Sequence, residues 1–248
     1  MDGIALEGDE TGGYRLRKDT PSVVIDGATY HAQIDLGGIA KGYAADRVAD
    51  LLAQEGYEYG YFSCGTSSIR LLKNASFSAR ESGDPAFSLQ VRIPRETEEN
   101  QDAYALIRVM DQSLSSSGDY DNNYVAGGSL CSHIISPFDG YPLNFAKEGV
   151  QQGVSTVTLL SGSAVEDDAL TTALCLMGKD RAIDYVNKNL REHSVAFVLY
   201  RADADFYEVV TNIPESELNI LDEAYRIAST VNEAGNIVYT GELLSAAP

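Results

Sequence analysis

The sequence has no tryptophan, only three histidines and three cysteines, and 18 Lys and Arg residues against 37 Asp and Glu residues. Cys64, Cys131 and Cys175 are widely spaced and form no Cys-x-x-Cys pair, so they support neither a disulfide framework nor a zinc site. Cys175 lies in the apolar run Ala-Leu-Cys-Leu-Met, which predicts a buried position. No stretch approaches the roughly 20 apolar residues of a membrane helix. The first ten residues lack the basic start and apolar core of a signal peptide.

The shortage of basic residues leaves a net charge of −19. This charge argues against nucleic acid or an anionic membrane surface as a partner, because both carry the same sign. It also repels any ligand that carries a pyrophosphate, so such a ligand would need a local cation. Otherwise the composition, 44% hydrophobic and 22% charged, is that of a globular protein able to bury a full core.

Apolar residues recur at helical spacing in three segments and at strand-like spacing in several others. Helices are predicted from residue 43 to a stop at Gly56, from residue 163 to a stop at Gly178, and over residues 180–190. Strands are predicted over residues 23–25, 30–34, 59–65, 89–93, 105–110, 154–160, 195–200, 206–211 and 225–229. Asp26-Gly27 predicts a hairpin turn between the first two strands. No linker divides the chain, so residues 1–248 are predicted to form one α+β domain, a mixed sheet with packed helices.

The first segment suited to chemistry is Asp-Leu-Gly-Gly-Ile-Ala-Lys-Gly-Tyr, residues 35–43. Glycines between a strand and a helix let the backbone approach a ligand closely, and free N–H groups at a helix start attract anions. Lys41 stands where its ammonium could meet a phosphate. A glycine-rich turn with a surface lysine is the alternative interpretation.

The second segment is Ser-Gly-Asp-Tyr, residues 117–120, followed by Ser-His-Ile-Ile-Ser-Pro-Phe-Asp-Gly-Tyr-Pro, residues 132–142. The apolar pair after His133 and the Pro…Gly…Pro spacing predict a strand that ends in a shaped turn. His133 is a candidate general base, because an unperturbed imidazole titrates near neutrality. A structural histidine at a strand end is the alternative.

The third segment is Glu-Asp-Asp-Ala-Leu-Thr-Thr-Ala, residues 166–173. Asp168 and Thr172 are four residues apart and therefore share one face of the predicted helix. A carboxylate and a hydroxyl are hard oxygen ligands, which suit Mg²⁺ or Ca²⁺ better than zinc. Helix capping is the alternative, because acidic residues in a first turn are favoured by the helix dipole.

Together and in this order, the three segments resemble the ApbE family of FAD:protein FMN transferases, also known as thiamine-biosynthesis lipoproteins. Residues 35–46 match the family motif almost letter for letter, and Ser-Gly-Asp-Tyr, His-Ile-Ile-x-Pro-x-x-Gly-Tyr-Pro and Asp-Ala-Leu-x-Thr-Ala are its other signatures. The resemblance runs from about residue 30 to about residue 200. It implies an ApbE-like, T-fold-related architecture and Mg²⁺-dependent transfer of FMN from FAD to a threonine. The acceptor would be a flavoprotein with a Ser/Thr-Gly-Ala-Thr/Ser motif.

The resemblance also implies a set of site residues. The metal ligands would be the Gly38 carbonyl, Asp168 and Thr172, and the catalytic candidates are His133 and Asp168. The residues expected to bind FAD are Asp35, Lys41, Ser117, Gly118, Asp119, His133 and Ile135. Either His133 or a metal-bound carboxylate could accept the proton of the threonine hydroxyl.

The chain departs from the family pattern in three places. Only 34 residues precede Asp35, where family members carry a longer portion that helps to enclose the flavin, so we expect a fragment or a shortened relative. Residues 63–66 replace an Asn-x-Gly-Gly motif, and Ser136 replaces an aspartate. The family is typically exported and lipid-anchored, whereas this chain shows no such signal. Three hypotheses remain: an FMN transferase, an FAD-binding or FAD-hydrolysing protein, and a structural relative without activity.

Overall fold

The computed structural model describes residues 4–18, 22–31, 33–65, 67–73, 86–93, 103–118, 123–126, 129–144, 152–201 and 204–241. The chain divides into two compact units, Met1–Leu36 and Gly37–Pro248, and each is described by itself. The single domain over residues 1–248 therefore remains a prediction. Among the described residues, no helix combines the length and the apolar character needed to cross a membrane.

The first unit consists of two antiparallel hairpins. Strand β1 (Ile4–Asp9) pairs with β2 (Gly13–Lys18), and β3 (Val23–Ile25) pairs with β4 (Ala28–Tyr30). Asp26 and Gly27 both have positive φ, 50° and 79°, as a two-residue hairpin turn requires. The predicted hairpin is confirmed. Its second arm spans Ala28–Tyr30, so the predicted bounds of 30–34 are wrong at both ends, because so short a turn places Ala28 directly opposite Ile25.

The second unit contains helices α1 (Ala40–Gln54), α3 (Ala164–Met177) and α4 (Lys179–Asn189). Its strands are β5 (Tyr59–Cys64), β6 (Ser68–Lys73), β7 (Phe87–Arg92), β8 (Ala103–Val109), β9 (Ser113–Gly118), β10 (Asn123–Ala126), β11 (Ser129–Ile135), β12 (Pro142–Asn144), β13 (Gln152–Ser161), β14 (Ser194–Arg201), β15 (Tyr207–Thr211), β16 (Leu218–Ile220), β17 (Tyr225–Ile227), β18 (Ser229–Val231) and β19 (Ile237–Tyr239). The three predicted helices are confirmed. The predicted α+β class is confirmed as well.

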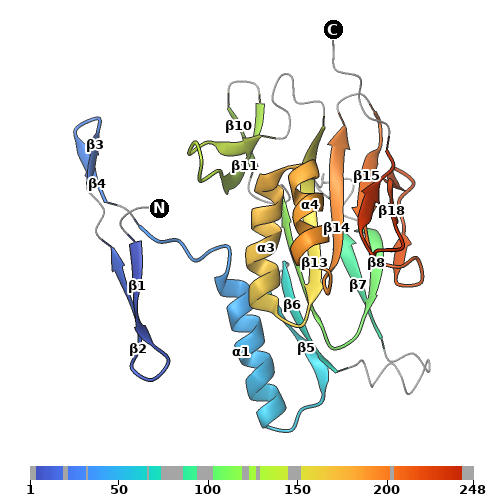
Figure 1. Ribbon diagram of the computed structural model, residues 1–248, viewed down its shortest axis with the longest axis horizontal. Coiled ribbons are helices and arrows are strands. Elements are labelled where there is room, and N and C mark those ends of the chain that lie inside the picture. Colours follow the sequence, from blue (N-terminus) through green and yellow to red (C-terminus); the bar gives the residue numbers. More distant parts are fainter. Residues whose placement is uncertain are drawn as a thin grey trace. The chain divides into compact units, whose positions relative to one another are not determined.

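A seven-stranded sheet in the order β17-β15-β14-β13-β9-β6-β5 forms the centre of this unit. Its neighbours are antiparallel except for the parallel pair β15–β17, so the sheet is mixed, as predicted. Helices α1, α3 and α4 cover one face (Figure 1), and the sheet β16-β8-β7 covers the other. The two faces of the central sheet each pack into a hydrophobic core. Consecutive residues of β13 point to opposite faces, so Leu159 is buried in the core beneath the helices and Leu160 in the core beneath the sheet β16-β8-β7.

Strand β9 was not predicted from the sequence, because Ser-Leu-Ser-Ser-Ser-Gly lacks the β-branched and aromatic residues typical of strands. Its serines are buried or half-buried, and their hydroxyl groups are hydrogen-bonded across the sheet and to α3. The strand exists because its neighbours satisfy these hydroxyls, which is information that lies elsewhere in the chain.

The predicted strand end and turn of the histidine motif are confirmed in the small sheet β10-β11-β12. Ile134 of β11 is buried against the helix-side core, whereas His133 and Ile135 on the opposite face are exposed. The turn over residues 137–140 returns the chain to β12, with Gly140 at a φ of 75°.

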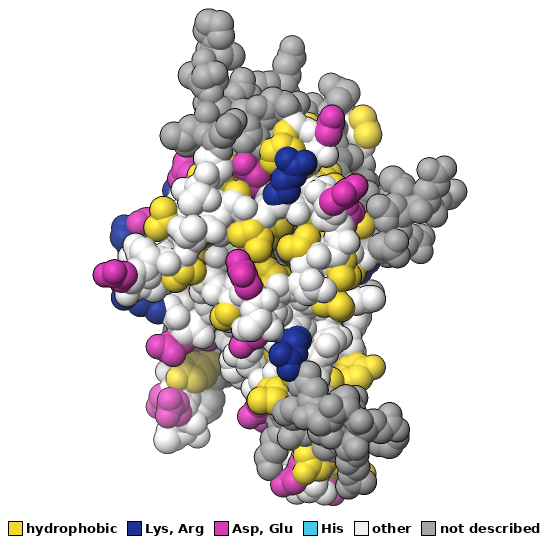
Figure 2. Space-filling view, turned by 90° about the vertical axis from the view of Figure 1, so that its right-hand side faces the viewer, with side chains coloured by type: hydrophobic (Ala, Val, Ile, Leu, Met, Phe, Trp, Pro, Cys, Tyr) yellow, Lys and Arg dark blue, Asp and Glu magenta, His cyan; other side chains and the backbone are white. Residues whose placement is uncertain are grey.

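Acidic side chains are spread over the face shown in Figure 2 rather than gathered in one patch.

Candidate functional site

Helices α1 and α3 approach each other closely at Gly42. A Cβ atom at this position would collide with the Ala164 carbonyl and would lie 2.8 Å from the Asp168 Cβ. The absence of a side chain brings the Gly42 N–H within 3.0 Å of Asp168 Oδ2, to which it donates a hydrogen bond. The glycine motif on α1 is thereby joined to the acidic motif on α3, which lies more than a hundred residues further along the chain.

Asp168 is a buried carboxylate with three polar contacts, its side chain being 2% exposed. Its Oδ2 accepts the Gly42 N–H, and its Oδ1 accepts the Ser68 hydroxyl at 3.2 Å. The Lys41 Nζ lies 3.2 Å from the same Oδ1 and also donates to the Gly37 carbonyl at 3.0 Å. Burying a charge is costly unless it is paired, and Lys41 supplies the pairing cation here.

The Thr172 hydroxyl lies beside Gly38 and Ser117. Ser117 Oγ is 3.1 Å from Thr172 Oγ1 and 2.9 Å from Thr171 Oγ1. A Cβ on Gly38 would lie 3.7 Å from Thr172 Oγ1, so Gly38 is a close neighbour of this hydroxyl. One turn earlier on α3 stands Asp168, whose carbonyl accepts the Thr172 hydroxyl at 3.4 Å. The structure therefore brings together five predicted site residues: Gly38, Lys41, Ser117, Asp168 and Thr172.

The other predicted site residues are not shown to contact this group, and one of them is not among the residues that the structure describes. His133 and Ile135 are exposed on β11, and within the described chain no hydrogen bond or ion pair links the His133 side chain to the group. Gly118 is buried in β9, where a Cβ would lie 2.7 Å from the Ser155 carbonyl, so its visible role is close strand packing. Asp35 belongs to the first unit, and Asp119 lies outside the described residues. Their roles remain predictions.

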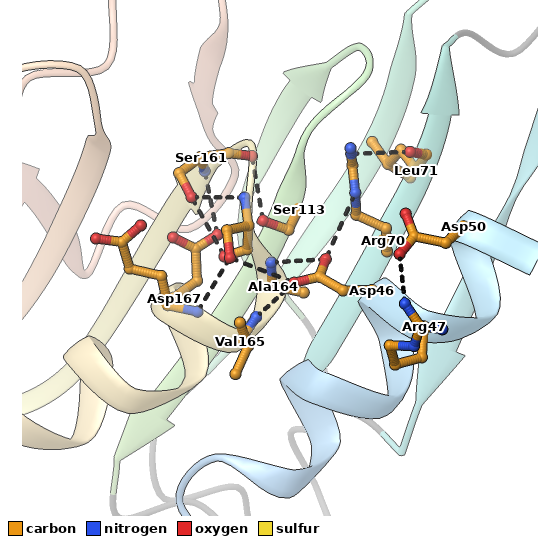
Figure 3. A network of polar contacts seen from close by, with 12 residues as sticks. Asp46, Arg47, Asp50, Arg70, Leu71, Ser113, Ser161, Ala164, Val165 and Asp167 are labelled. Atoms are coloured by element: carbon orange, nitrogen blue, oxygen red, sulfur yellow. Dashed lines mark hydrogen bonds and ion pairs between the residues drawn. The ribbon is translucent and has the colours of Figure 1, made fainter. Parts of the chain in front are cut away.

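Asp46 of α1 was not identified as a site residue from the sequence, although its side chain binds the first residues of α3. Its carboxylate accepts the Ala164 and Val165 N–H groups, both at 3.0 Å, and the Ser163 hydroxyl at 3.3 Å (Figure 3). Arg70 Nε lies 3.7 Å from the same carboxylate. Asp46 follows Gly42 by four residues and so shares its helix face, which is the signal that could have revealed it. It fixes the position of α3, and hence of Asp168.

Asp167, the neighbour of Asp168, belongs to a different polar network (Figure 3). Its Oδ2 accepts the Ser113 hydroxyl at 2.5 Å and the Ser161 N–H at 3.1 Å, while Oδ1 has no hydrogen-bond partner among the described residues. Burial raises the pKa of Asp167 from 3.8 to about 6, against the lowering effect of these hydrogen bonds and of His193. Adjacent carboxylates on α3 thus have separate roles, since Asp168 contacts a cation and Asp167 is held by neutral donors.

A cavity of about 690 Å³ lies between the small sheet and the end of α3. Its lining combines aromatic, apolar and polar side chains, as sites for organic ligands do. The lining residues are Tyr124, Ala126, Cys131, Ser136, Asp139, Tyr141, Pro142, Leu143 and Leu176. Ser136 therefore lines a space large enough for a flat ring system.

Comparison with known proteins assigns the chain to a family. Residues 11–198 match the model of the ApbE family. The FAD:protein FMN transferase of Escherichia coli K12 is 27% identical over 173 residues, 70% of this chain and 42% of that protein. The protein of that name from Vibrio cholerae serotype O1 is 30% identical over 177 residues, 71% of this chain and 46% of that protein.

A solved structure agrees with these sequence matches. The flavin transferase ApbE from Vibrio cholerae superposes on the chain with a TM-score of 0.61 and 26% identity, over 85% of this chain and 56% of that one. The chain spans less than half the length of the two curated relatives described above. Because the family match covers most of the sequence and includes all three glycine, histidine and acidic segments, the chain belongs to the ApbE family.

Proposed function

We propose that this chain transfers FMN from FAD to a threonine of an acceptor protein in a Mg²⁺-dependent reaction. The observation that carries the proposal is the contact of Lys41 with the buried Asp168, one turn from Thr172. This arrangement occurs in a member of a family whose relatives bear the name FAD:protein FMN transferase. It provides cationic and oxygen groups suited to a pyrophosphate with its metal.

The donor atoms at this place fit Mg²⁺. Asp168 offers a carboxylate, Thr172 a hydroxyl and Gly38 a backbone carbonyl, all of them hard oxygen ligands. In the described part of the chain, no three His, Cys, Asp or Glu side chains lie close enough together to hold a metal ion. The proposed set needs only one carboxylate. A bound Mg²⁺ would neutralise charge that develops on the phosphate oxygens.

The chain's own residues would bind the pyrophosphate at the start of α1. Ile39 stands before the helix without a side-chain cap, and of the first-turn N–H groups that of Gly42 donates to Asp168. Phosphate oxygens would accept from the remaining N–H groups at this helix start. Lys41, in the first turn, adds the local cation that an otherwise acidic protein needs in order to bind FAD. The cavity beside Tyr141 and Ser136 is of a size for a ring of the dinucleotide.

In the transfer step, the threonine oxygen would attack the phosphorus of the FMN half, and the bond from that phosphorus to the AMP oxygen would break. AMP leaves with the bonding electrons, and the threonine proton passes to a base. His133, exposed on β11, and Asp168 are the two candidates for that base. Asp168 already accepts two hydrogen bonds besides its contact with Lys41, which leaves His133 the less engaged of the two.

The proposal also includes the protein that accepts FMN and the place in the cell where the reaction occurs. We propose a flavoprotein acceptor with a Ser/Thr-Gly-Ala-Thr/Ser motif, at the cell envelope. The nearest match within this chain is Asp26-Gly27-Ala28-Thr29, where aspartate replaces the first hydroxyl residue, so self-modification is not expected.

The test is calorimetric titration of FAD into the protein with and without Mg²⁺, on the native chain and on Asp168→Asn. We expect binding that requires Mg²⁺ and is lost in the variant. Asp184→Asn, which changes an exposed carboxylate paired with Lys188 on α4, is the matched control and should bind as the native chain does.

A second measurement separates transfer from the alternative activities. The protein is incubated with FAD, Mg²⁺ and an acceptor carrying the motif, and covalent flavin is read by fluorescence in a denaturing gel. Release of FMN and AMP without labelling would indicate an FAD pyrophosphatase, and binding without turnover an FAD-binding protein. Absence of any Mg²⁺-dependent FAD binding would refute the proposed site.

A further inference from the structure

Lys41 is bound by the same kinds of atoms that would bind the metal. Its ammonium lies between the Gly37 carbonyl, at 3.0 Å, and Asp168 Oδ1, at 3.2 Å. Asp168 is also the carboxylate proposed to bind Mg²⁺, and the carbonyl is one residue from that of Gly38. The ammonium therefore occupies a position with a carboxylate and a carbonyl as neighbours, which resembles part of the proposed metal shell.

Two cations cannot share this carboxylate oxygen at low cost. A magnesium ion on Asp168 Oδ1 would stand within a few ångströms of the Lys41 ammonium, and the repulsion grows as a site is removed from water. Asp168 is 2% exposed, so screening by solvent is weak. Entry of the metal and the Lys41–Asp168 contact are therefore in competition.

Asp168 and Lys41 differ in their freedom to respond. The carboxylate is held by the Gly42 N–H and the Ser68 hydroxyl, which stay in place when the ammonium leaves. The Lys41 side chain, in the first turn of α1, is 36% exposed. Its ammonium is carried on a flexible four-carbon stem. Its ammonium can move toward solvent, and toward a pyrophosphate at the helix start, without a change in the helix.

We propose that Lys41 acts as an internal substitute for the metal: it neutralises Asp168 in the metal-free protein, and Mg²⁺ displaces it toward the pyrophosphate. This inference rests on the proposed function and adds an order to it. Because the metal releases the cation that binds the phosphates, Mg²⁺ and FAD bind with positive coupling, each strengthening the other.

The experiment follows the reactivity of Lys41 in the full chain. The protein is treated briefly with a small amine-reactive acylating reagent, and modification of each lysine is quantified by mass spectrometry. Three samples are compared: metal-free, with Mg²⁺, and with Mg²⁺ plus inorganic pyrophosphate. We expect labelling of Lys41 to be slow in the first, several-fold faster in the second, and slow again in the third.

Two controls define the cause of any change. Lys188, an exposed lysine 2.7 Å from Asp184 on α4, should be labelled equally in all three samples. In Asp168→Asn, Lys41 should be labelled rapidly with or without Mg²⁺, because its counter-ion is gone. Circular dichroism of this variant verifies that the fold persists.

The outcomes separate this inference from the proposed function on which it depends. Calorimetry of Mg²⁺ alone reports whether the metal binds and whether Asp168→Asn abolishes binding. If Mg²⁺ binds through Asp168 but labelling of Lys41 is unchanged or falls, the substitution of lysine by metal is wrong and the metal site stands. If Mg²⁺ alone does not bind but FAD binding still requires Mg²⁺, the displacement of Lys41 by the metal is wrong and the proposed function stands. If FAD binding does not depend on Mg²⁺ either, both proposals are refuted.

Discussion

The raised pKa of Asp167 makes a quantitative prediction for the Asp167→Asn variant. In the folded protein this carboxyl group binds its proton more tightly than in the unfolded chain, since its pKa rises from 3.8 to about 6. The stability that the protonated group contributes is thus fully present below a pH of about 4 and is lost as the pH rises through 6. The shift corresponds to about 3 kcal/mol at neutral pH.

Asparagine is a neutral replacement of the same shape. Its amide oxygen can accept the Ser113 hydroxyl and the Ser161 N–H as Oδ2 does, and any cost of the amide nitrogen in place of the unpartnered Oδ1 is independent of pH. We therefore expect the free energy of unfolding of Asp167→Asn, relative to the native chain, to rise by about 2 kcal/mol between pH 4.5 and pH 8.

Urea unfolding followed by circular dichroism at the two pH values measures this difference. Comparison of variant and native chain at each pH cancels the titration of all other groups. Asp184→Asn, at an exposed position on α4, controls for the loss of one negative charge and should show little change with pH. A difference between Asp167→Asn and the native chain that is equal at both pH values would refute the raised pKa.

Three further predictions concern the helix contact and the site. Asp46→Ala removes the acceptor of the Ala164 and Val165 N–H groups and should lower the free energy of unfolding by about 1–2 kcal/mol in urea titrations, whereas the exposed Asp50→Ala should change it by less than about 0.5 kcal/mol. Gly42→Ala forces α1 from α3 and should cost about 1–3 kcal/mol in the same assay; an unchanged midpoint would contradict the close approach. Lys41→Gln should weaken FAD binding in the presence of Mg²⁺ by about tenfold in calorimetry, and unaltered affinity would exclude Lys41 from the pyrophosphate site.

Local patterns in the sequence determined the features that depend on near neighbours. The helical period alone placed Asp168 and Thr172 on one face of α3, and the structure has them one turn apart. The Asp-Gly pair alone predicted a hairpin turn, because few other residues adopt positive φ at both central positions. The ordered motifs alone also identified the family, which the match over residues 11–198 confirms.

Only the tertiary structure decided which distant groups meet. That Lys41 pairs with Asp168, and that Asp46 holds the start of α3, depends on how closely two helices pack, and the packing depends on the missing side chain of Gly42. The serine-rich β9 likewise becomes a strand because side chains from β13 and α3 satisfy its hydroxyls. Contacts between residues far apart in sequence leave no periodic signal within either segment, and so they appear only when the chain is folded.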